Sequence, residues 1–143
     1  MGIELQANVA ELARSNIQQW GLESRVAIEV DDVRPRPAMP EFEVVTMYNN
    51  IYYFRVEERV SLLAHFRKFI KPGGFLLLTT CCQGGNCGME VPNLWGAATA
   101  AAGRLPSVAE MQRQLSEAGY GSIDAMGLIP GDSFYAFRAY ANS

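Results

Sequence analysis

The spacing of apolar residues predicts three helices, over residues 6–20, 56–70 and 107–118. In the first, apolar side chains recur at intervals of three and four residues, at Val9, Leu12, Ala13, Ile17 and Trp20. Gly21 then ends that helix. In the third, Ser107 precedes Glu110 by three residues, which is the pattern of a capping box, and Gly119 follows its end.

Short apolar or β-branched runs predict the strands, at residues 2–5, 25–30, 42–48, 75–80, 121–129 and 133–140. The runs FEVVTMY (42–48) and FLLLTT (75–80) have no polar alternation, so they predict strands buried on both faces. The residues KPGG at 71–74 predict a sharp turn between a helix and a strand. A long stretch, 81–106, begins as a polar, glycine-rich loop, and its later alanines allow a short helix.

This order of elements predicts an α/β fold. Strands that alternate with helices favour a mainly parallel sheet with helices on both faces, which makes three layers. The last two strands, joined by the turn at residues 130–132, predict an antiparallel pair near the edge of the sheet. With 143 residues, we expect a single domain over residues 1–143.

Composition excludes several functions. The net charge is −3 and only two of the twelve basic residues are lysine, so a nucleic-acid surface is not expected. No apolar run approaches a membrane span of about 18 residues, and no secretory leader is visible. Three cysteines without paired spacing predict neither a disulfide framework nor a metal site, and favour a reducing cytoplasm.

Polar residues stand where several strands end. Glu4 follows the first apolar piece, Asp31 and Asp32 follow the second strand, and Asn49 and Asn50 follow the third. The carboxyl ends of parallel strands are where open α/β sheets bind ligands. Each residue also has a plain structural explanation, because acids stabilise helix starts and Asp and Asn are common in turns.

Four segments, in this order, resemble a known family. They are GIEL (2–5), VDDV (30–33), FEVVTMYNNIYYF (42–54) and LLAHFRKFIKPGGFLLLTT (62–80). Together with the antiparallel last pair, they resemble class I, Rossmann-like S-adenosylmethionine-dependent methyltransferases of the small-molecule type. The resemblance covers nearly the whole chain and implies methyl transfer from the sulfonium of S-adenosylmethionine to a small-molecule acceptor.

The resemblance also implies residue roles. Six residues are expected at the cofactor, namely Glu4 and Leu5 at the ribose, Asp32 and Val33 at the adenine, and Tyr48 and Asn49 near the methionine and sulfonium end. A carboxylate accepts hydrogen bonds from both ribose hydroxyls, and an aromatic face suits a sulfonium cation.

Substrate contacts are expected from the loops that follow the central strands, with Asn50, Tyr53, Gln83 and Trp95 as candidates and Asn86 and Glu90 beside them. Tyr53 and its aromatic neighbours have an equal alternative as packing residues of a crossover loop, and residues 81–96 as a flexible lid. No catalytic residue is assigned, and His65, in mid-helix, is not expected to be one.

The family pattern also implies a first strand and a glycine-rich loop ahead of Glu4, which this sequence does not contain. A truncated product, a strand borrowed from a partner, and a sheet in which the second family strand meets the fourth are the three explanations. In each we expect weak or absent cofactor binding by the monomer, and a homodimer through exposed sheet edges. The rival functions are a nicotinamide-dependent oxidoreductase and a non-catalytic fragment that associates with itself.

Overall fold

The structure is a computed structural model that describes residues 1–84, 87–99 and 103–141. The chain divides into two compact units, Met1–Pro37 and Ala38–Ser143. The expectation of one domain over residues 1–143 stays a prediction.

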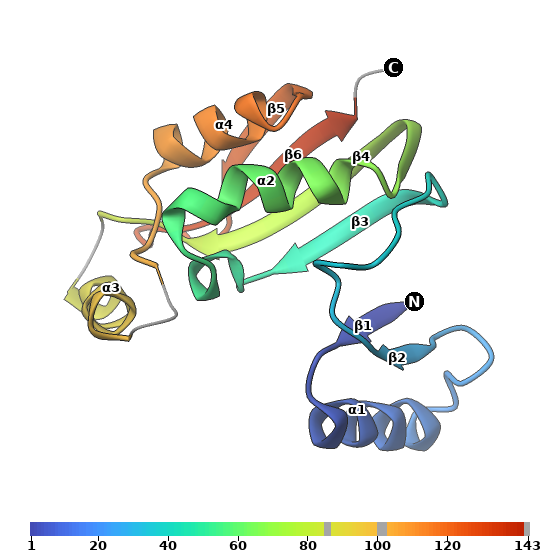
Figure 1. The fold of residues 1–143 in the computed structure, drawn as a ribbon. Helices are drawn as coiled ribbons and strands as arrows, with labels where there is room; N and C mark the ends of the chain where they lie inside the picture. Colours follow the sequence, from blue (N-terminus) through green and yellow to red (C-terminus); the bar gives the residue numbers. More distant parts are fainter. Residues whose placement is uncertain (85–86, 100–102, 142–143) are drawn as a thin grey trace. The chain divides into compact units, whose positions relative to one another are not determined.

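The first unit is a small β-α-β arrangement. It consists of β1 (Gly2–Glu4), α1 (Ala7–Gln19) and β2 (Ile28–Val30), and the two strands pair in parallel (Figure 1). Glu4 lies opposite Val30 in this ladder, and the backbone of Asp31 continues it by donating to the Glu4 carbonyl at 3.1 Å. The carboxyl ends of both strands therefore meet, as the sequence predicted.

Helix α1 matches its predicted range and ends before Gly21, whose φ of +64° is a left-handed conformation that suits glycine. The expected apolar face is not buried. Only Ala10 is buried in residues 1–37, while Leu12 and Trp20 are 63% and 71% exposed. Strand β2 is shorter than predicted because the backbone of Val26 donates to the Leu22 carbonyl in a turn.

The second unit contains a four-stranded sheet in the order β3-β4-β6-β5. Its strands are β3 (Phe42–Tyr48), β4 (Ile70–Cys81), β5 (Tyr120–Gly127) and β6 (Phe134–Ala141). Strands β3 and β4 are parallel, whereas β6 is antiparallel to both β4 and β5 (Figure 1). The α/β class and the closing antiparallel pair are confirmed.

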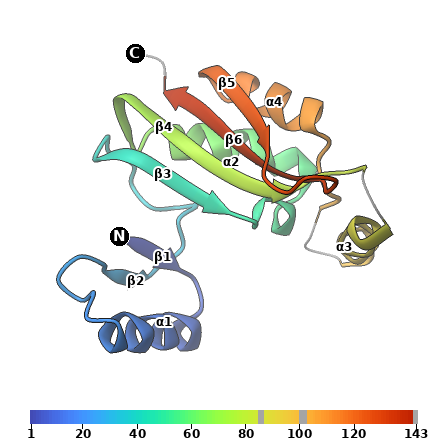
Figure 2. The ribbon, with the colours of Figure 1, turned by 180° about the vertical axis from the view of Figure 1, so that it is seen from behind.

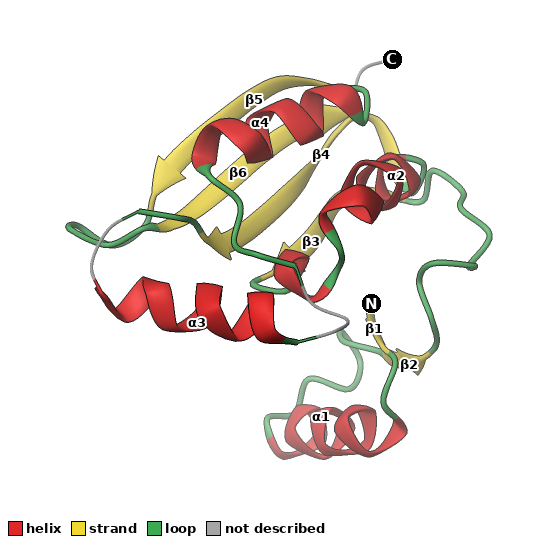
Figure 3. Cartoon of the chain, turned by 60° about the vertical axis from the view of Figure 1, so that its left-hand side comes forward, coloured by secondary structure: helices red, strands yellow, loops and turns green. Residues whose placement is uncertain are grey.

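Two helices, α2 (Val56–Arg67) and α4 (Val108–Glu117), cover one face of this sheet. The face beneath them is the core, where Leu76, Leu78 and Phe137 are fully buried. A one-turn 3₁₀ helix, η1 (Ile51–Tyr53), precedes α2, and α3 (Cys87–Ala98) lies beyond the carboxyl ends of β3 and β4 (Figure 3). In the described part of the chain, no helix is long and apolar enough to cross a membrane.

Among the described residues of this unit, no helix lies against the other face of the sheet (Figure 2). Met47 points into the core and is 2% exposed, but Val44 and Tyr48, on the opposite side of β3, are 42% and 73% exposed. The prediction that residues 42–48 are buried on both faces is therefore wrong for this chain, since only one face is covered.

Two boundaries also differ from the prediction. Helix α2 ends at Arg67 and β4 begins at Ile70, so the KPGG segment lies inside a strand. Gly73, with φ of +80°, makes an irregularity there, and the β3–β4 register shifts between Phe42 and Val44. Residues 87–98, expected to be largely loop, form α3.

The described strands form a two-stranded sheet in the first unit and a four-stranded sheet in the second. Among the described strands, β1 pairs with β2 alone and β3 pairs with β4 alone. The explanation in which the second family strand meets the fourth stays a prediction, because those strands, β1 and β3, belong to different units. Each of them has one edge without a strand partner in the described residues.

Candidate functional site

The first unit presents carboxylates at the ends of adjacent strands. Glu4 is half-buried, and its Oε1 accepts a hydrogen bond of 2.9 Å from the backbone of Gln6, just before α1 begins. This contact is the structural role open to an acid at a helix start. It uses one oxygen of the carboxylate, so the other is left as an acceptor. Leu5 follows it and is exposed.

Asp32 is held by an arginine two residues later. Its Oδ1 and Oδ2 accept bonds of 2.9 and 2.7 Å from Nε and Nη2 of Arg34, and Oδ1 also accepts from the Arg34 backbone at 3.0 Å. The side-chain hydrogen bonds from Arg34, followed by the backbone one, lower the pKa of Asp32. The carboxylate is therefore ionised at neutral pH, and Val33 lies half-buried beside it.

A second arginine orders the neighbouring acids. Nη1 of Arg36 lies 2.6 Å from Glu29 Oε2 and 2.8 Å from Asp31 Oδ2. The strand end thus has two acids, Glu4 and Asp32, with further acceptor capacity, and two arginines that fix the loop behind them. Such a pair of carboxylates suits a ligand that presents hydroxyl and amino donors.

In the second unit, the end of β3 is strained. Asn49 has a φ of +48°, the left-handed region that few residues other than glycine adopt. Its backbone donates to the Thr79 carbonyl at 2.7 Å, and its Oδ1 accepts from the backbone of Cys81 at 3.4 Å. Tyr48, just before it, makes an edge-on contact with Phe134.

Asn50 has an unsatisfied acceptor. Its Oδ1 is buried and has no hydrogen-bond partner among the described residues. A buried polar atom left without a partner costs about 1–3 kcal/mol, so such atoms mark places where a ligand group would be stabilising. Strain and an unsatisfied acceptor therefore occur at consecutive positions of the predicted site.

Three aromatic side chains follow. The rings of Tyr52 and Tyr53 lie 4.8 Å apart, and Tyr53 meets Trp95 of α3 edge-on at 6.0 Å. Burial, and then the neighbouring Tyr53, raise the pKa of Tyr52 to about 12, so this phenol stays protonated. Tyr53 and Trp95 are both exposed, at 53% and 48%, and form an aromatic wall that a ligand can reach.

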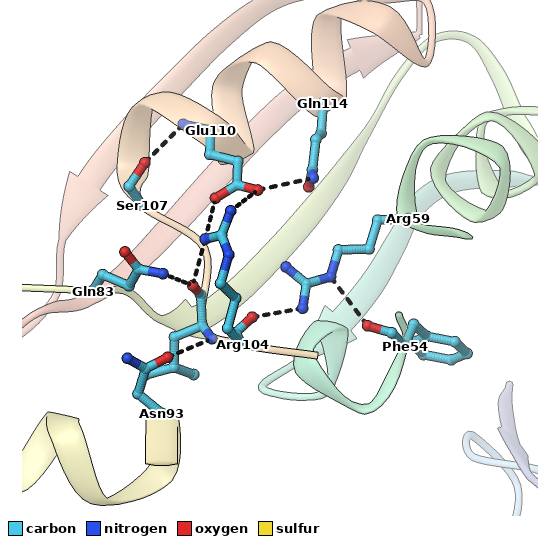
Figure 4. A network of polar contacts seen from close by, with 9 residues as sticks. Phe54, Arg59, Gln83, Asn93, Arg104, Ser107, Glu110 and Gln114 are labelled. Carbon is cyan, nitrogen blue, oxygen red and sulfur yellow. Dashed lines mark hydrogen bonds and ion pairs between the residues drawn. The ribbon is translucent and has the colours of Figure 1, made fainter. Parts of the chain in front are cut away.

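Gln83, a predicted substrate contact, is engaged within the fold. Its Nε2 donates to the Leu105 carbonyl at 2.5 Å and its backbone donates to the Pro106 carbonyl at 2.9 Å (Figure 4). Glu90 belongs to α3, and Asn86 lies outside the described residues. Gln83 therefore has a structural contact that the sequence did not indicate.

Sequence reasoning missed the network around Arg59 (Figure 4). This side chain is fully buried and bonds two backbone carbonyls. A signal was present, since Arg59 lies four residues before Leu63 and seven before Phe66, so it shares the helix face that faces the core.

Other reactive side chains do not add to the site. Burial raises the pKa of the Cys82 thiol to about 12 and also raises that of Cys81, so neither is a ready thiolate. His65 of α2 packs edge-on against Phe69, which follows the end of that helix. Within the residues that the structure describes, no group of three or more His, Cys, Asp or Glu side chains could hold a metal ion.

Comparisons with known proteins identify the family. Residues 1–74, just over half of the 143-residue chain, match the model of a methyltransferase domain. No curated protein matches the chain. Several solved structures share the fold. A candidate O-methyltransferase from Nostoc punctiforme is 20% identical with a TM-score of 0.86, over 97% of this chain and 43% of that protein.

Two further structures are similar. An O-methyltransferase family 2 protein from Planctomyces limnophilus, solved with apigenin, is 17% identical with a TM-score of 0.78, over 95% of this chain and 41% of that one. Human N-acetylserotonin methyltransferase, solved with S-adenosylmethionine, is 16% identical with a TM-score of 0.69, over 87% and 38%. The chain thus spans less than half of each protein. It belongs to the methyltransferase domain family, and its fold is that of the class I, Rossmann-like, S-adenosylmethionine-dependent members.

Proposed function

We propose that this chain forms part of an S-adenosylmethionine-dependent methyltransferase that acts on a small-molecule acceptor. The observation that supports this most directly is the pair of acids at the ends of the parallel strands β1 and β2, inside the segment that matches the family. When bound, the cofactor supplies an electrophilic methyl group on a sulfonium.

The residues of the first unit fit the polar part of such a cofactor. Glu4 has a carboxylate oxygen beyond the one that Gln6 uses, which suits ribose hydroxyls. Asp32 is ionised, and although Arg34 engages both its oxygens, each has a second lone pair for an amino donor such as that of adenine. Leu5 and Val33 are the flanking residues of the same site.

The residues of the second unit fit the reacting end and the acceptor. Tyr48 presents an exposed aromatic ring, and Asn49 holds the strained turn in which Asn50 keeps an unsatisfied acceptor. The exposed Tyr53 and Trp95 offer a flat apolar contact to an acceptor. These residues would bind and orient, and positioning is the main contribution a protein makes to an in-line displacement.

Two observations bear on the kind of acceptor and on the cellular compartment. A net charge of −3 with few lysines favours a small molecule over a nucleic acid. The two described cysteines, Cys81 and Cys82, are free thiols, as suits a reducing cytoplasm.

The test is a calorimetric titration of the folded chain with S-adenosylhomocysteine, and separately with NAD. We expect saturable but weak binding of S-adenosylhomocysteine, with a dissociation constant on the order of 0.1–1 mM, about 4–5 kcal/mol. Glu4→Gln and Asp32→Asn should each weaken it at least about tenfold, the loss of about 1.4 kcal/mol. Glu11→Gln, an exposed acid of α1, is the matched control and should not.

Three other outcomes of this titration would contradict parts of the proposal. Preferential binding of NAD would overturn the proposal in favour of an oxidoreductase. No saturable signal from a folded sample at millimolar ligand would overturn a cofactor site in this chain and leave the self-associating, non-catalytic alternative. An equal effect of Glu11→Gln would mean that general charge, and not the strand-end acids, attracts the ligand.

We further propose that the chain forms a homodimer through the open edge of β3. In the described residues this seven-residue strand has one paired edge, and Val44 and Tyr48 beside the open one are exposed. Open edges are templates for strand pairing, and a lysine blunts them. Light scattering across a concentration series should show a dimer that Val44→Lys disrupts and Met126→Lys, on the opposite edge strand, does not. A monomer at every concentration would contradict this.

A further inference from the structure

An extended segment, residues 103–107, leads into α4 and is called the strap below. Its first residue packs directly against the loop that follows β3. The backbone of Gly103 donates to the Tyr52 carbonyl at 2.8 Å. A Cβ added at Gly103 would lie 2.5 Å from Nη2 of Arg59 and 2.7 Å from the Phe54 carbonyl, so only glycine fits without displacement.

One buried side chain connects this loop to the strap. Nε of Arg59 donates to the Phe54 carbonyl at 3.2 Å, and its Nη2 donates to the Arg104 carbonyl at 2.7 Å (Figure 4). The guanidinium forms no ion pair with a carboxylate in the described residues, and its Nη1 is buried without a partner there. Burial lowers the pKa of Arg59, yet an arginine stays charged in proteins.

Burying a charged side chain without a carboxylate partner costs free energy. An unpaired, desolvated cation is disfavoured relative to an apolar side chain of similar size. What a guanidinium offers instead is a rigid fork that fixes two acceptors at a set distance. The two acceptors here belong to the segment after η1 and to the strap, so the fork sets the spacing between them.

The strap is tied on its other side to α3. The backbone of Leu105 donates to Oδ1 of Asn93 at 3.1 Å (Figure 4). A Cβ added at Gly96 would lie 2.6 Å from the Gly103 carbonyl, so the helix backbone packs closely on the strap. Trp95 lies between these two contact residues in sequence. The position of the strap therefore determines where α3 presents Trp95.

We infer that Arg59 is a positioning residue that sets the distance between Tyr53 and Trp95 through the strap. The inference rests on the proposed function, in which these two rings contact the acceptor. Arg59 itself is fully buried, so it presents no surface to a cofactor or an acceptor. Its fork fixes the segment carrying Tyr53 on one side, and the strap, through Asn93 and Gly96, fixes the helix carrying Trp95 on the other.

The strap is also anchored to α4, which is part of the core. Arg104 forms a two-pronged ion pair with Glu110, with distances of 2.7 and 3.0 Å, and Ser107 caps the helix. A change at Arg59 should therefore shift the aromatic wall while the sheet and α4 remain folded. That separation allows a positioning role to be distinguished from a purely stabilising one.

The experiment reads Trp95 in the full chain, with Trp20→Phe as the parent so that Trp95 is the sole indole. Arg59→Lys and Arg59→Gln are compared by emission spectrum and acrylamide quenching without denaturant. A lysine reaches one carbonyl but cannot bridge two in a fixed fork. The indole is 48% exposed, so losing its contacts can raise the quenching constant by up to about twofold.

In Arg59→Gln we expect the acrylamide quenching constant of Trp95 to rise and its emission to shift to the red. The rise should be smaller in Arg59→Lys, and the far-ultraviolet circular dichroism of both variants should match the parent. Gly103→Ala should give the same rise in quenching and the same red shift, because its methyl group would displace the Arg59 guanidinium. Arg113→Lys, an exposed arginine of α4, is the matched control and should leave Trp95 unchanged. Should Arg59→Gln fail to fold, Arg59→Lys and Gly103→Ala decide the question.

Parental quenching in the folded Arg59 and Gly103 variants would overturn the inference, even if their unfolding midpoints fell. S-adenosylhomocysteine titration of the same variants separates this failure from failure of the proposed function. In the proposed function Glu4 and Asp32 hold the cofactor, so cofactor affinity should not change with Arg59. A Trp95 shift without any cofactor binding would retain the positioning role of Arg59 and reject the methyltransferase proposal.

Discussion

The two units of the chain are held together in different ways. In residues 1–37, only Ala10 is buried, the strands are three residues long, and exposed ion pairs order the loop after β2. The second unit has a four-stranded sheet with a core that includes Leu76, Leu78 and Phe137 under two helices. One unit relies on its backbone ladder and surface charges, and the other on apolar burial.

This difference distinguishes two sets of predicted site residues, one on each unit. The acids expected at the cofactor lie on the unit with almost no core, whereas the residues expected at the acceptor lie on the well-packed unit. Apolar burial contributes roughly 25 cal/mol per Å², while exposed ion pairs contribute little. The acceptor side is therefore built on a stable scaffold, and the cofactor side depends on weaker interactions.

The largest expected effect is in amide hydrogen exchange. Amides of β4 and β6 should exchange only through global unfolding, slowed by several orders of magnitude, because both strands lie inside the sheet. Amides of β1, β2 and α1 should exchange far faster. Exchange followed by mass spectrometry on peptides from both units tests this. Equal protection in both units would show that the first has a source of stability beyond its own packing.

A matched pair of leucine substitutions sharpens the same contrast. Leu78→Ala removes a fully buried side chain of β4 and should lower the unfolding free energy by about 2–5 kcal/mol. Leu12→Ala, on α1, should change it by less than about 0.5 kcal/mol because that side chain is 63% exposed. Urea unfolding followed by circular dichroism measures both. A large effect of Leu12→Ala would mean that its side chain is covered in solution.

Alkaline pH should affect the second unit through Tyr120. Its hydroxyl donates to the Leu63 carbonyl at 3.1 Å, and burial raises its pKa above the ordinary value of about 10. The unfolded chain loses this proton at lower pH than the folded one, so its stabilising contribution is complete below about pH 10 and falls above it.

The variant Tyr120→Phe tests the direction of this pH dependence of stability. At neutral pH it should be less stable by about 1 kcal/mol, the net value of a hydrogen bond. Above pH 10 the gap between the two proteins should narrow, because only the tyrosine protein has this proton to lose. Urea midpoints from pH 8 to pH 11 give the comparison. A gap that stays constant or widens with pH would contradict the stated pKa direction.

The smallest effect is expected at the Asp32–Arg34 pair. Arg34→Gln removes the fork that lowers the pKa of Asp32, so that pKa should return toward its ordinary value. The unfolding free energy near pH 7 should change little, because exposed ion pairs are screened by solvent. A nuclear magnetic resonance titration of the Asp32 carboxyl checks the shift. An unchanged pKa would mean that another group holds this carboxylate.

Local signals predicted most of the fold. The helix that starts after Ser107 formed as expected, because the Ser107 hydroxyl accepts from the Glu110 backbone three residues on. In a capping box the Glu110 carboxylate would also accept a hydrogen bond from the Ser107 backbone. Here that carboxylate binds Arg104 instead. The antiparallel pair around Gly131, with φ of +79°, also follows from turn chemistry.

Tertiary contacts decided the rest. The KPGG segment, predicted as a turn, belongs to β4 because β4 pairs with β3 on both sides of the irregularity at Gly73. The candidate site followed from strand ends, a positional rule that identified Glu4, Asp32 and Asn49. It could not reveal that Gln83 binds the strap, since that contact joins residues 22 positions apart.

The bare face of the second sheet has a practical consequence for ligand screening. Val44, Tyr48 and Met126 expose apolar surface in the native state, and environment-sensitive dyes bind such surface. Thermal-shift assays that use these dyes should therefore start from a high fluorescence baseline with a small melting signal. Screens for cofactors and acceptors of this protein are better run with intrinsic tryptophan fluorescence or calorimetry.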